Sequence, residues 1–448
     1  MLNVDQAEAR AGALIDAARK AGADSADVLY VGEASLGIQV RLGELEDVGR
    51  SEGEEIGLRL FIGARSASVS SSDLSPEALS ALVERALAMA KEAPEDPYAG
   101  LAPEELLFRG GLLALESDDG ADPSPAELKQ RALEMESAAR AVAGVTNSEG
   151  AGVSASRSVF ALATSHGFCR GYHSSHYSAG VSVVGGEGGA MQRDHASHNS
   201  RHYADLDGPE QLGRLAGERT VKRLNPGKLA SGVMPIVFDP RVGGGLVGHL
   251  LSAMSGPGIA RRTSFLLGRE GEQIMPETLS IVDDPHLVRG LRSRPFDGEG
   301  VATARRALVD GGRLAGWLLN SASARQLGLA PNGHATRGIG GAPGVGATNV
   351  HLTPGTQSPS ELIADIGHGL YVTEMIGQGI NPVTGDYSRG ASGFIIRGGE
   401  IAEPVAEITV AGNLLDMYRS LSAANDLEHR RAVNVPTLRV EGMTVAGA

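Results

Sequence analysis

Residues 365–417 read DIGHGLYVTEMIGQGINPVTGDYSRGASGFIIRGGEIAEPVAEITVAGNLLDM, and this stretch sets glycines and polar residues beside apolar ones. The apolar run at residues 394–396 is typical of a strand, and a Gly-Gly-Glu turn sequence follows it. Residues 404–410, PVAEITV, predict a second strand. Because each glycine increases the entropy that the backbone loses on folding, such density indicates many tight turns. The stretch therefore predicts a strand-rich C-terminal region with Gly-rich turns.

Outward from this stretch, punctuation by Gly and Pro divides the chain into three predicted domains. Residues 1–105 form an N-terminal α+β domain, residues 106–230 a middle helix-plus-strand domain, and residues 231–448 the strand-rich C-terminal domain. The predicted fold class is α+β, with an α/β-sandwich-like first domain and a mixed middle domain.

The predicted helices carry recognisable start and stop signals. Ser124 and Glu127 make a capping box, and Gly22 follows the first Ala-rich segment as a stop. Residues 28–70 and 144–206 show short β-like runs separated by Gly turns. The expected helices span residues 5–20, 75–91, 124–143, 209–224, 241–254 and 358–367.

Composition excludes several classes of function. The 448-residue chain has a formal charge of −14, which disfavours nucleic-acid binding because that requires a cationic surface. Its single cysteine, Cys169, cannot form an intrachain disulfide. No window of 18 apolar residues predicts a membrane span, and the N-terminal sequence MLNVDQAEARAG lacks the pattern of a signal peptide. We expect a cytoplasmic protein that binds neither nucleic acid nor membrane.

Several segments of the last two-thirds of the chain resemble one known family. The quoted C-terminal stretch resembles the signature of the TldD/PmbA family, on its PmbA (TldE) side, a two-subunit metallopeptidase of bacteria and archaea. Order and spacing match from about residue 165 onward, and the nine-residue run at 295–303 is more specific than any three-residue motif. The other matching segments are SFLL at 264–267, PHL at 285–287, PFDGEGVAT at 295–303 and GWLLNSASARQLG at 316–328.

The resemblance explains a glycine-rich segment that follows a predicted strand. Residues 243–248 fit the GxGxxG pattern of dinucleotide-binding folds, but no second parallel strand with an acidic residue is evident after them. In TldD-type catalytic subunits this position carries HExxxH on a helix, where two His bind zinc and the Glu acts as base. Gly244, Gly245 and His249 stand at the matching positions here. One imidazole cannot form a catalytic zinc site, so we expect neither metal nor catalytic residues in this chain.

Six of the 12 histidines lie between residues 166 and 202. Their i, i+3 pairs would suit a metal only on a helix or turn, because residues three apart in a strand point to opposite faces. The alternatives are a polar strand surface and, for His166 with Cys169, a thiol nucleophile or simply a half-buried thiol. The histidines concerned are His166, His173, His176, His195, His198 and His202.

Acidic and basic residues in the matching segments are the remaining candidates for a substrate chamber. Two carboxylates two apart on a strand would share one face, which could suit acid–base work or a cation. They equally suit acceptance of backbone N–H bonds in Gly-rich loops. Residues 388–393, SRGASG, could cradle an anion such as a peptide carboxylate. The chamber candidates are His249, Asp297, Glu299, Glu374, Asp386 and Arg389.

The resemblance implies a function through a partner. A TldD-type subunit would supply zinc and the general base, while this chain would pair with it and shape a chamber for peptides or small unfolded proteins. The alternative is a non-enzymatic homodimer that binds peptides or another protein, and the isolated chain could also form a homodimer. A third interpretation is an independent hydrolase that uses His249, the other histidines or Cys169. Older names in the family refer to modulation of DNA gyrase, but the charge of −14 does not favour direct DNA contact.

Overall fold

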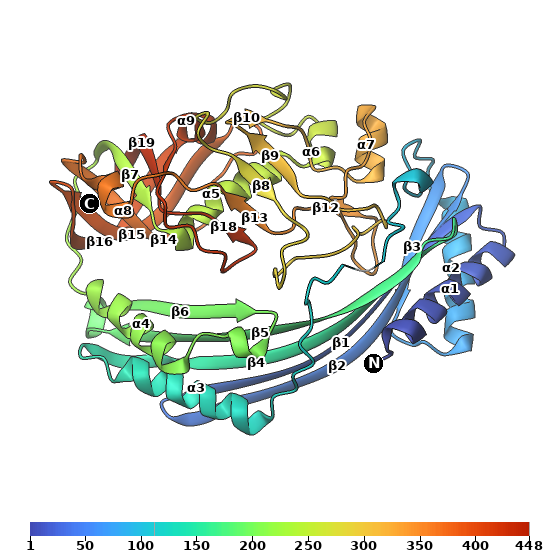
Figure 1. Ribbon diagram of the computed structural model, residues 1–448, viewed down its shortest axis with the longest axis horizontal. Helices are drawn as coiled ribbons and strands as arrows, with labels where there is room; N and C mark the ends of the chain where they lie inside the picture. Colours follow the sequence, from blue (N-terminus) through green and yellow to red (C-terminus); the bar gives the residue numbers. More distant parts are fainter. Residues whose placement is uncertain (112, 448) are drawn as a thin grey trace.

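One long antiparallel sheet dominates the N-terminal half of the computed structural model, which describes residues 1–111 and 113–447. Its strand order is β3-β2-β1-β4-β5-β6, and it curves as an arc beneath the C-terminal part (Figure 1). At about 3.3 Å per residue, its longest strands span roughly 60 Å. The strands are β1 (Ser25–Arg41), β2 (Glu44–Ile62), β3 (Arg65–Ser71), β4 (Val145–Thr164), β5 (Cys169–Gly185) and β6 (Gln192–Ser200).

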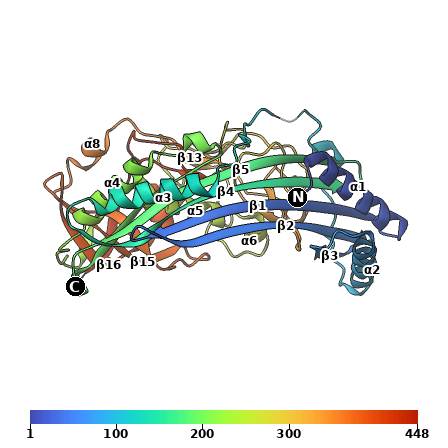
Figure 2. The ribbon, with the colours of Figure 1, turned by 90° about the horizontal axis from the view of Figure 1, so that it is seen from below.

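Two helix pairs cover the same face of this sheet, one pair at each end (Figure 2). Side chains alternate between faces along a strand, and the residues of β1 that pack on both pairs have even numbers, such as Val28 at one end and Ile38 at the other. The odd-numbered Asp27 and Leu29 lie on the opposite face. One pair is α1 (Val4–Lys20) and α2 (Pro76–Glu92), and the other is α3 (Pro125–Arg140) and α4 (Pro209–Lys222).

The C-terminal part contains a closed ring of strands. Each strand pairs with the next in the order β19, β7, β14, β15 and β16. β16 then pairs back onto β19, and this last pairing closes the ring. β17 pairs with the beginning of β19. The elements are β7 (Gly232–Phe238), β14 (His368–Ile376), β15 (Asp386–Arg397), β16 (Glu400–Asn413), β17 (Ser422–Ala423) and β19 (Leu438–Ala446).

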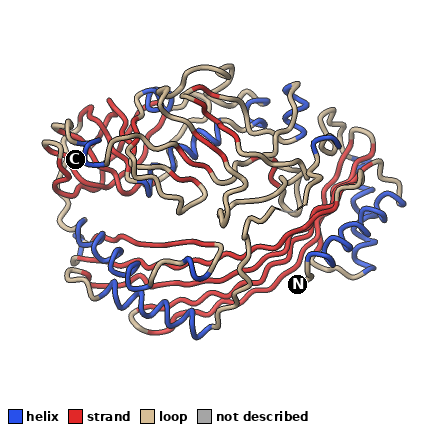
Figure 3. Tube along the Cα trace, viewed as in Figure 1, coloured by secondary structure: helices blue, strands red, loops and turns tan. Residues whose placement is uncertain are grey.

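A smaller sheet of order β10-β9-β8-β13-β18 and a two-stranded pair, β11 with β12, complete the C-terminal part. Figure 3 shows that long loops connect these short elements. The strands are β8 (Ile281–Asp283), β9 (Arg306–Asp310), β10 (Arg313–Leu314), β11 (Ala335–Thr336), β12 (Gly344–Val345), β13 (Val350–Leu352) and β18 (Val433–Asn434). The helices are α5 (Pro240–Ala253), α6 (Gly256–Ala260), α7 (Ser321–Leu327), α8 (Pro359–Ile363) and α9 (Leu414–Arg419), and the 3₁₀ turns are Glu104–Leu106, Gly188–Ala190 and Tyr203–Asp205.

Most of the predicted elements are confirmed. The capping box of Ser124 and Glu127 opens α3, and the predicted strands at 394–396 and 404–410 lie in β15 and β16. Gly398 and Gly399 form their turn with φ of 58° and 81°, a region that favours glycine. The predicted helix over residues 358–367 was wrong in extent, because α8 ends at Ile363. Beyond it, the Gly367 carbonyl accepts a bond from Gly398 and the chain enters β14.

The long sheet crosses the predicted boundary at residue 105. β1 and β2, from the first predicted domain, and β4 to β6, from the second, share one hydrogen-bonded ladder. Leu29 pairs with Gly57 on one side and with Leu162 on the other. The two helix pairs nevertheless have separate hydrophobic cores, so the division into three domains stays a prediction.

The inner face of the sheet meets the C-terminal part at a buried junction, which we define by Asp27, Gly57, Arg59, Arg337 and Ile339. Arg59 Nε donates to Asp27 Oδ2 over 2.7 Å, and Arg337 Nη2 donates to Asp27 Oδ1 over 2.7 Å. Burial opposes ionisation of Asp27, but the two guanidiniums outweigh it and lower the pKa of the carboxyl. The junction therefore joins parts of the chain that lie 310 residues apart.

Beside the junction, Phe296 seats the conspicuous 295–303 segment against the sheet. Its ring centroid lies 5.1 Å from that of Phe168 and 5.6 Å from that of Tyr172, both in edge-on geometry. Such aromatic pairs contribute about 0.5–1.5 kcal/mol each beyond the area they bury. Among the described residues, no helix is both long and apolar enough to cross a membrane.

Candidate functional site

α5 begins directly where β7 ends. Asp239 caps the helix by accepting a bond from the Arg241 main-chain N–H over 2.8 Å, and Pro240 occupies the first helical position. Tyr371 Oη donates to the second oxygen of Asp239 over 3.2 Å. The next strand after α5 is β8, which belongs to a different sheet, so the glycine pattern of this segment is not part of a dinucleotide-binding βαβ unit.

One side of α5 carries little but backbone. A Cβ atom added at Gly245 or Gly248 would meet nothing within 4 Å, and one added at Gly244 would lie 3.4 Å from the Val433 carbonyl oxygen. Gly248 also lines a cavity of about 510 Å³ together with Ser252 and Arg292. The fold therefore has room for side chains at residues 244 and 245, but the sequence supplies none.

His249 is half-buried on the same helix, beside β15. Its ring lies edge-on to that of Tyr387, with the centroids 6.0 Å apart. Burial, reinforced by the Arg389 guanidinium, lowers the pKa of the His249 imidazole to about 4, so the ring is neutral at physiological pH. His249 Nε2 and Arg389 Nε are both buried without a hydrogen-bond partner among the described residues.

The residues of this site do not fit a zinc ion. A catalytic zinc needs three protein ligands, and α5 offers one imidazole flanked by glycines at the other two motif positions. No group of three or more His, Cys, Asp or Glu side chains in the described part of the chain has an arrangement suited to a metal. What the site offers is a neutral imidazole near a guanidinium, each with one buried nitrogen that lacks a hydrogen-bond partner among the described residues.

The other candidates from the C-terminal stretch have separate surroundings. Glu374, on β14, forms an ion pair with Arg223 at the end of α4, and Arg223 also lies 3.5 Å from Asp194 Oδ2 on β6. Asp386 is exposed and accepts bonds from Thr384 Oγ1 over 2.6 Å and from Asn413 Nδ2 over 3.3 Å. Glu374 thus holds the C-terminal part against α4, whereas Asp386 closes a surface turn.

Asp297 and Glu299 lie in a buried turn near the junction, not in a strand as their spacing had suggested. Asp297 accepts main-chain N–H bonds from Glu299, Val301 and Ala335 over 2.9–3.0 Å. Glu299 accepts bonds from both the N–H and the hydroxyl of Ser321 over 2.8 Å. The two carboxylates bind the backbone donors of their loops, which is the structural one of the two roles that the sequence allowed.

Burial raises the pKa of the Asp297 carboxyl to about 7, and the neighbouring Glu299 adds to this effect, while the main-chain donors oppose it. The folded state therefore retains a proton that the unfolded chain releases near pH 4. Since the folded pKa is the higher one, this stabilisation is present below pH 4 and is lost as pH rises through 7.

We expect the free energy of unfolding to fall by up to roughly 4 kcal/mol between pH 4 and pH 8 from this group. Urea denaturation at a series of pH values would measure it, and Asp297→Asn should remove that part of the slope. The exposed Asp386→Asn is a matched control, since the bonds from Thr384 and Asn413 lower the pKa of Asp386 and it titrates below this window. Equal slopes in wild type and Asp297→Asn would contradict the prediction.

The six histidines of residues 166–202 are dispersed. His173 lies 3.5 Å from Asp118, and His202 Nε2 lies 3.0 Å from the Glu116 carbonyl oxygen. His198 Nδ1 accepts a bond from the Asp207 N–H over 3.1 Å. Along β5 and β6 the paired histidines three residues apart alternate faces, as expected of strands.

Cys169 is half-buried, and its Sγ lies 3.5 Å from the Glu8 carbonyl oxygen. Burial raises the pKa of this thiol, which disfavours the thiolate that a nucleophile needs. His166 bonds instead to Thr164 Oγ1 and to the Ala102 carbonyl. The observed surroundings therefore favour a structural thiol.

Sequence reasoning missed a buried ion network where β6, α4 and α5 meet. Asp194 Oδ1 accepts a bond from Arg241 Nη1 over 2.9 Å, and its other oxygen faces Arg223. Asp194 is 5% exposed, so it must be paired to remain charged. The one available signal was the Asp239-Pro-Arg241 sequence, which places an arginine in the first turn of a helix where the backbone dipole disfavours a cation.

Comparisons with known proteins agree along the chain. The models of the PmbA/TldA metallopeptidase family match in order: domain 1 over residues 26–90, the central domain over residues 118–224 and the C-terminal domain over residues 231–447. Metalloprotease PmbA of Escherichia coli O157:H7 is 39% identical, over 95% of this chain and 92% of its own length. The PmbA homolog of Haemophilus influenzae is 38% identical, over 97% of this chain and 94% of its own length.

Solved structures show the same fold. A protein from Bacteroides thetaiotaomicron, described as a modulator of DNA gyrase, superposes with a TM-score of 0.92 at 26% identity and covers 100% of both chains. TldE from Thermococcus kodakarensis superposes with a TM-score of 0.88, covering 98% of this chain and 100% of its own. The identity to TldE is 22%, so that likeness concerns the fold alone.

Proposed function

Because the chain belongs to the TldD/PmbA metallopeptidase family, on its PmbA side, we propose that it is the subunit without a metal site in a two-subunit cytoplasmic peptidase. In this proposal a TldD-type partner carries HExxxH and supplies zinc and the general base. The substrates are peptides or small unfolded proteins.

The observation that carries the proposal is the glycine side of α5. A helix that held HExxxH would need side chains at residues 244 and 245, and both residues are glycine although the fold leaves room for more. His249 alone keeps an imidazole, whose pKa is lowered and whose Nε2 has no partner among the described residues. A chain without catalytic residues contributes to peptide hydrolysis only by positioning the substrate in the partner's active site.

We assign to this chain the orientation of the substrate and the exclusion of water from the partner's active site. Holding a peptide bond in the geometry of attack lowers the barrier without any reacting group from the holder. His249 and Arg389 are the candidates for this role, because each has a buried nitrogen that lacks a hydrogen-bond partner among the described residues. Glu374 supports it indirectly by fixing β14 to α4 through Arg223.

The test is a peptide-hydrolysis assay with zinc content measured on the same samples. Three preparations are compared: this chain alone, an HExxxH-bearing relative from the same organism alone, and the two co-purified. We expect hydrolysis and zinc in the co-purified complex, zinc in the relative, and neither in this chain alone.

Two results would overturn the proposal. Hydrolysis with one zinc per chain in this protein alone would make it an independent enzyme. Failure to co-purify, with full activity of the relative alone, would instead favour the alternative of a non-enzymatic homodimer that binds peptides or another protein.

A further inference from the structure

A polar cavity of about 620 Å³ lies between the N-terminal sheet and the C-terminal part. Its walls come from the edge strand β6, from α4, from the start of α5 and from the loop before β18. A volume of this size falls within the range of ordinary ligand pockets. Four arginines from three separate segments line what we call the arginine cavity: Arg219, Arg241, Arg430 and Arg431.

Two of these arginines are paired with carboxylates. Arg241 donates to Asp194 over 2.9 Å and to Asp239 over 3.2 Å, and Arg430 forms an ion pair with Asp207. These contacts tie α5 to β6 and tie the loop before β18 to the segment that precedes α4. They hold the walls of the cavity in place and leave these two guanidiniums largely satisfied.

The other two arginines have no carboxylate partner among the described residues. Arg219 Nη1 donates to the His195 carbonyl over 3.2 Å, and Arg431 Nη1 donates to the Arg241 carbonyl over 2.7 Å. Each guanidinium has five N–H donors, so most of the donors of both groups remain available. Arg219 on α4 and Arg431 in the loop before β18 thus line one cavity, each without an ion-pair partner among the described residues.

Neighbouring acids offset this charge only in part, because Asp239 favours the charged form of both arginines without forming an ion pair with either. Asp426 accepts bonds from the N–H and the hydroxyl of Thr437 over 2.8 Å, and Glu428 lies 3.9 Å from Arg430. Burial, together with the charge of Arg241, lowers the pKa of both Arg219 and Arg431, which means that their positive charges are held at a cost. An anion between them would remove that cost.

We propose that the arginine cavity binds an oxyanion between Arg219 and Arg431, and that the C-terminal carboxylate of a peptide supplies it. Planar guanidiniums match the two oxygens of a carboxylate or phosphate group with paired N–H bonds. The choice of a peptide as the source rests on the proposed function. Inorganic phosphate carries the same chemistry and is the alternative source.

The test measures binding by this chain alone, with a dye-labelled short peptide that has a free C-terminal carboxylate, the same peptide with a C-terminal amide, and inorganic phosphate as competitor. We expect amidation to weaken binding at least about 10-fold. Arg219→Ala and Arg431→Ala should each weaken it roughly 10- to 100-fold, since a hydrogen-bonded charge is lost. Arg219→Lys, which keeps the charge, should recover part of the loss and also guards against an effect of misfolding.

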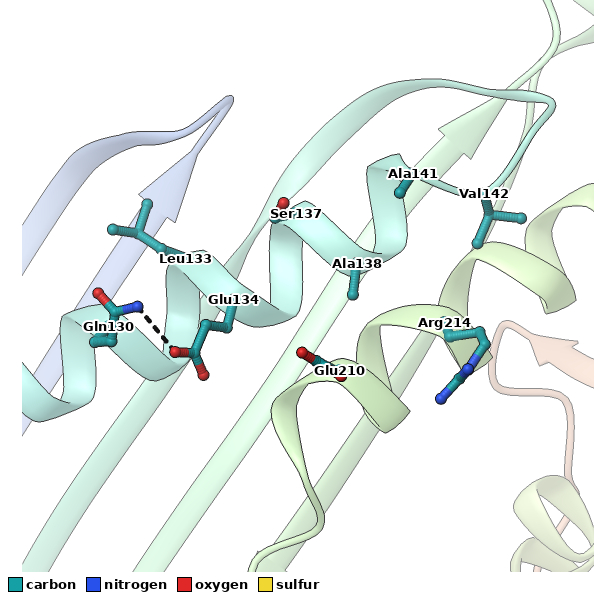
Figure 4. A pocket seen from close by; sticks show the side chains of 9 residues that line it. All are labelled: Gln130, Leu133, Glu134, Ser137, Ala138, Ala141, Val142, Glu210 and Arg214. Atoms are coloured by element: carbon teal, nitrogen blue, oxygen red, sulfur yellow. Dashed lines mark hydrogen bonds between the residues drawn. The ribbon is translucent and has the colours of Figure 1, made fainter.

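Arg214→Ala is the matched control. Arg214 lies on the same helix but lines a different cavity, between α3 and α4 and beside Glu210 (Figure 4). Its removal should leave binding unchanged. Competition by phosphate with no effect of amidation would keep the oxyanion site but overturn the peptide carboxylate as its source. Unchanged peptide affinity in Arg219→Ala and Arg431→Ala would overturn the site itself. Absence of binding of both the peptide and phosphate would do the same.

This assay needs neither the catalytic partner nor zinc. Loss of the proposed peptidase activity with intact anion binding would therefore count against the proposed function only. Intact hydrolysis by the complex without anion binding would count against the cavity only.

Discussion

Asp27→Ala is expected to lower the free energy of unfolding by roughly 3–5 kcal/mol, because it leaves two guanidiniums buried without their counter-charge. The side chains of Asp27, Arg59 and Arg337 are only 4%, 8% and 1% exposed. Arg337 depends on Asp27 most, since its Nε and Nη1 have no hydrogen-bond partner among the described residues. A loss of this size is a large fraction of the 5–15 kcal/mol that stabilises a typical domain.

Urea denaturation of the wild type and the variant would measure this difference. Asp27→Asn keeps the shape but removes the charge, so it separates the ionic part of the effect from the lost contacts. Asp16→Ala, at an exposed position on α1, is the control and should change stability by less than about 0.5 kcal/mol. A loss below about 1 kcal/mol in Asp27→Ala would show that water reaches the junction and that the pair is not buried in solution.

Gly57→Ala should produce the second large effect, at the same junction. A Cβ atom at this position would lie 2.0 Å from the Ile339 carbonyl oxygen, and the obstacle is backbone, which cannot rotate away. The loop that carries Arg337 would have to move off the sheet. We expect a loss of about 1–3 kcal/mol or more, the range for overpacking a buried contact.

Gly53→Ala supplies a control on the same strand. A Cβ atom there meets nothing within 4 Å, so the substitution should be neutral or stabilising by up to about 1 kcal/mol through the lower entropy of the unfolded chain. Denaturation midpoints compare the two variants, and limited proteolysis near residue 339 would report whether the loop is released. Equal stability of Gly53→Ala and Gly57→Ala would refute close contact between β2 and this loop.

Local signals in the sequence predicted most elements of the fold correctly. The capping box at Ser124 begins α3, and the Gly-Gly pair at residues 398–399 forms the turn between β15 and β16. Both signals involve residues only a few positions apart. The structural role of Asp297 was also foreseeable, because glycine neighbours leave main-chain N–H groups without helix or sheet partners. These features depend on short-range chemistry alone.

Long-range partners could not be predicted in this way. Alternation along β1 shows that Asp27 and Val28 face opposite sides, but nothing in the sequence pairs Asp27 with Arg337. The pairing of β1 with β4 crosses the predicted boundary at residue 105, because a Pro- and Gly-rich segment has the same composition whether it links two domains or connects strands of one sheet. Arg219 and Arg431 share a cavity only because α4 and the loop before β18 converge in space.

The closed ring has a consequence for how a ribosome-bound chain avoids aggregation. β19 pairs with β7 on one edge and with β16 on the other, yet it is the last of the ring strands to be synthesised. Until it emerges, β7 and β16 expose unpaired backbone groups of the kind that recruit strands from other chains. The ring can therefore close only after β19 has emerged, and until then both strand edges are open to pairing with another chain.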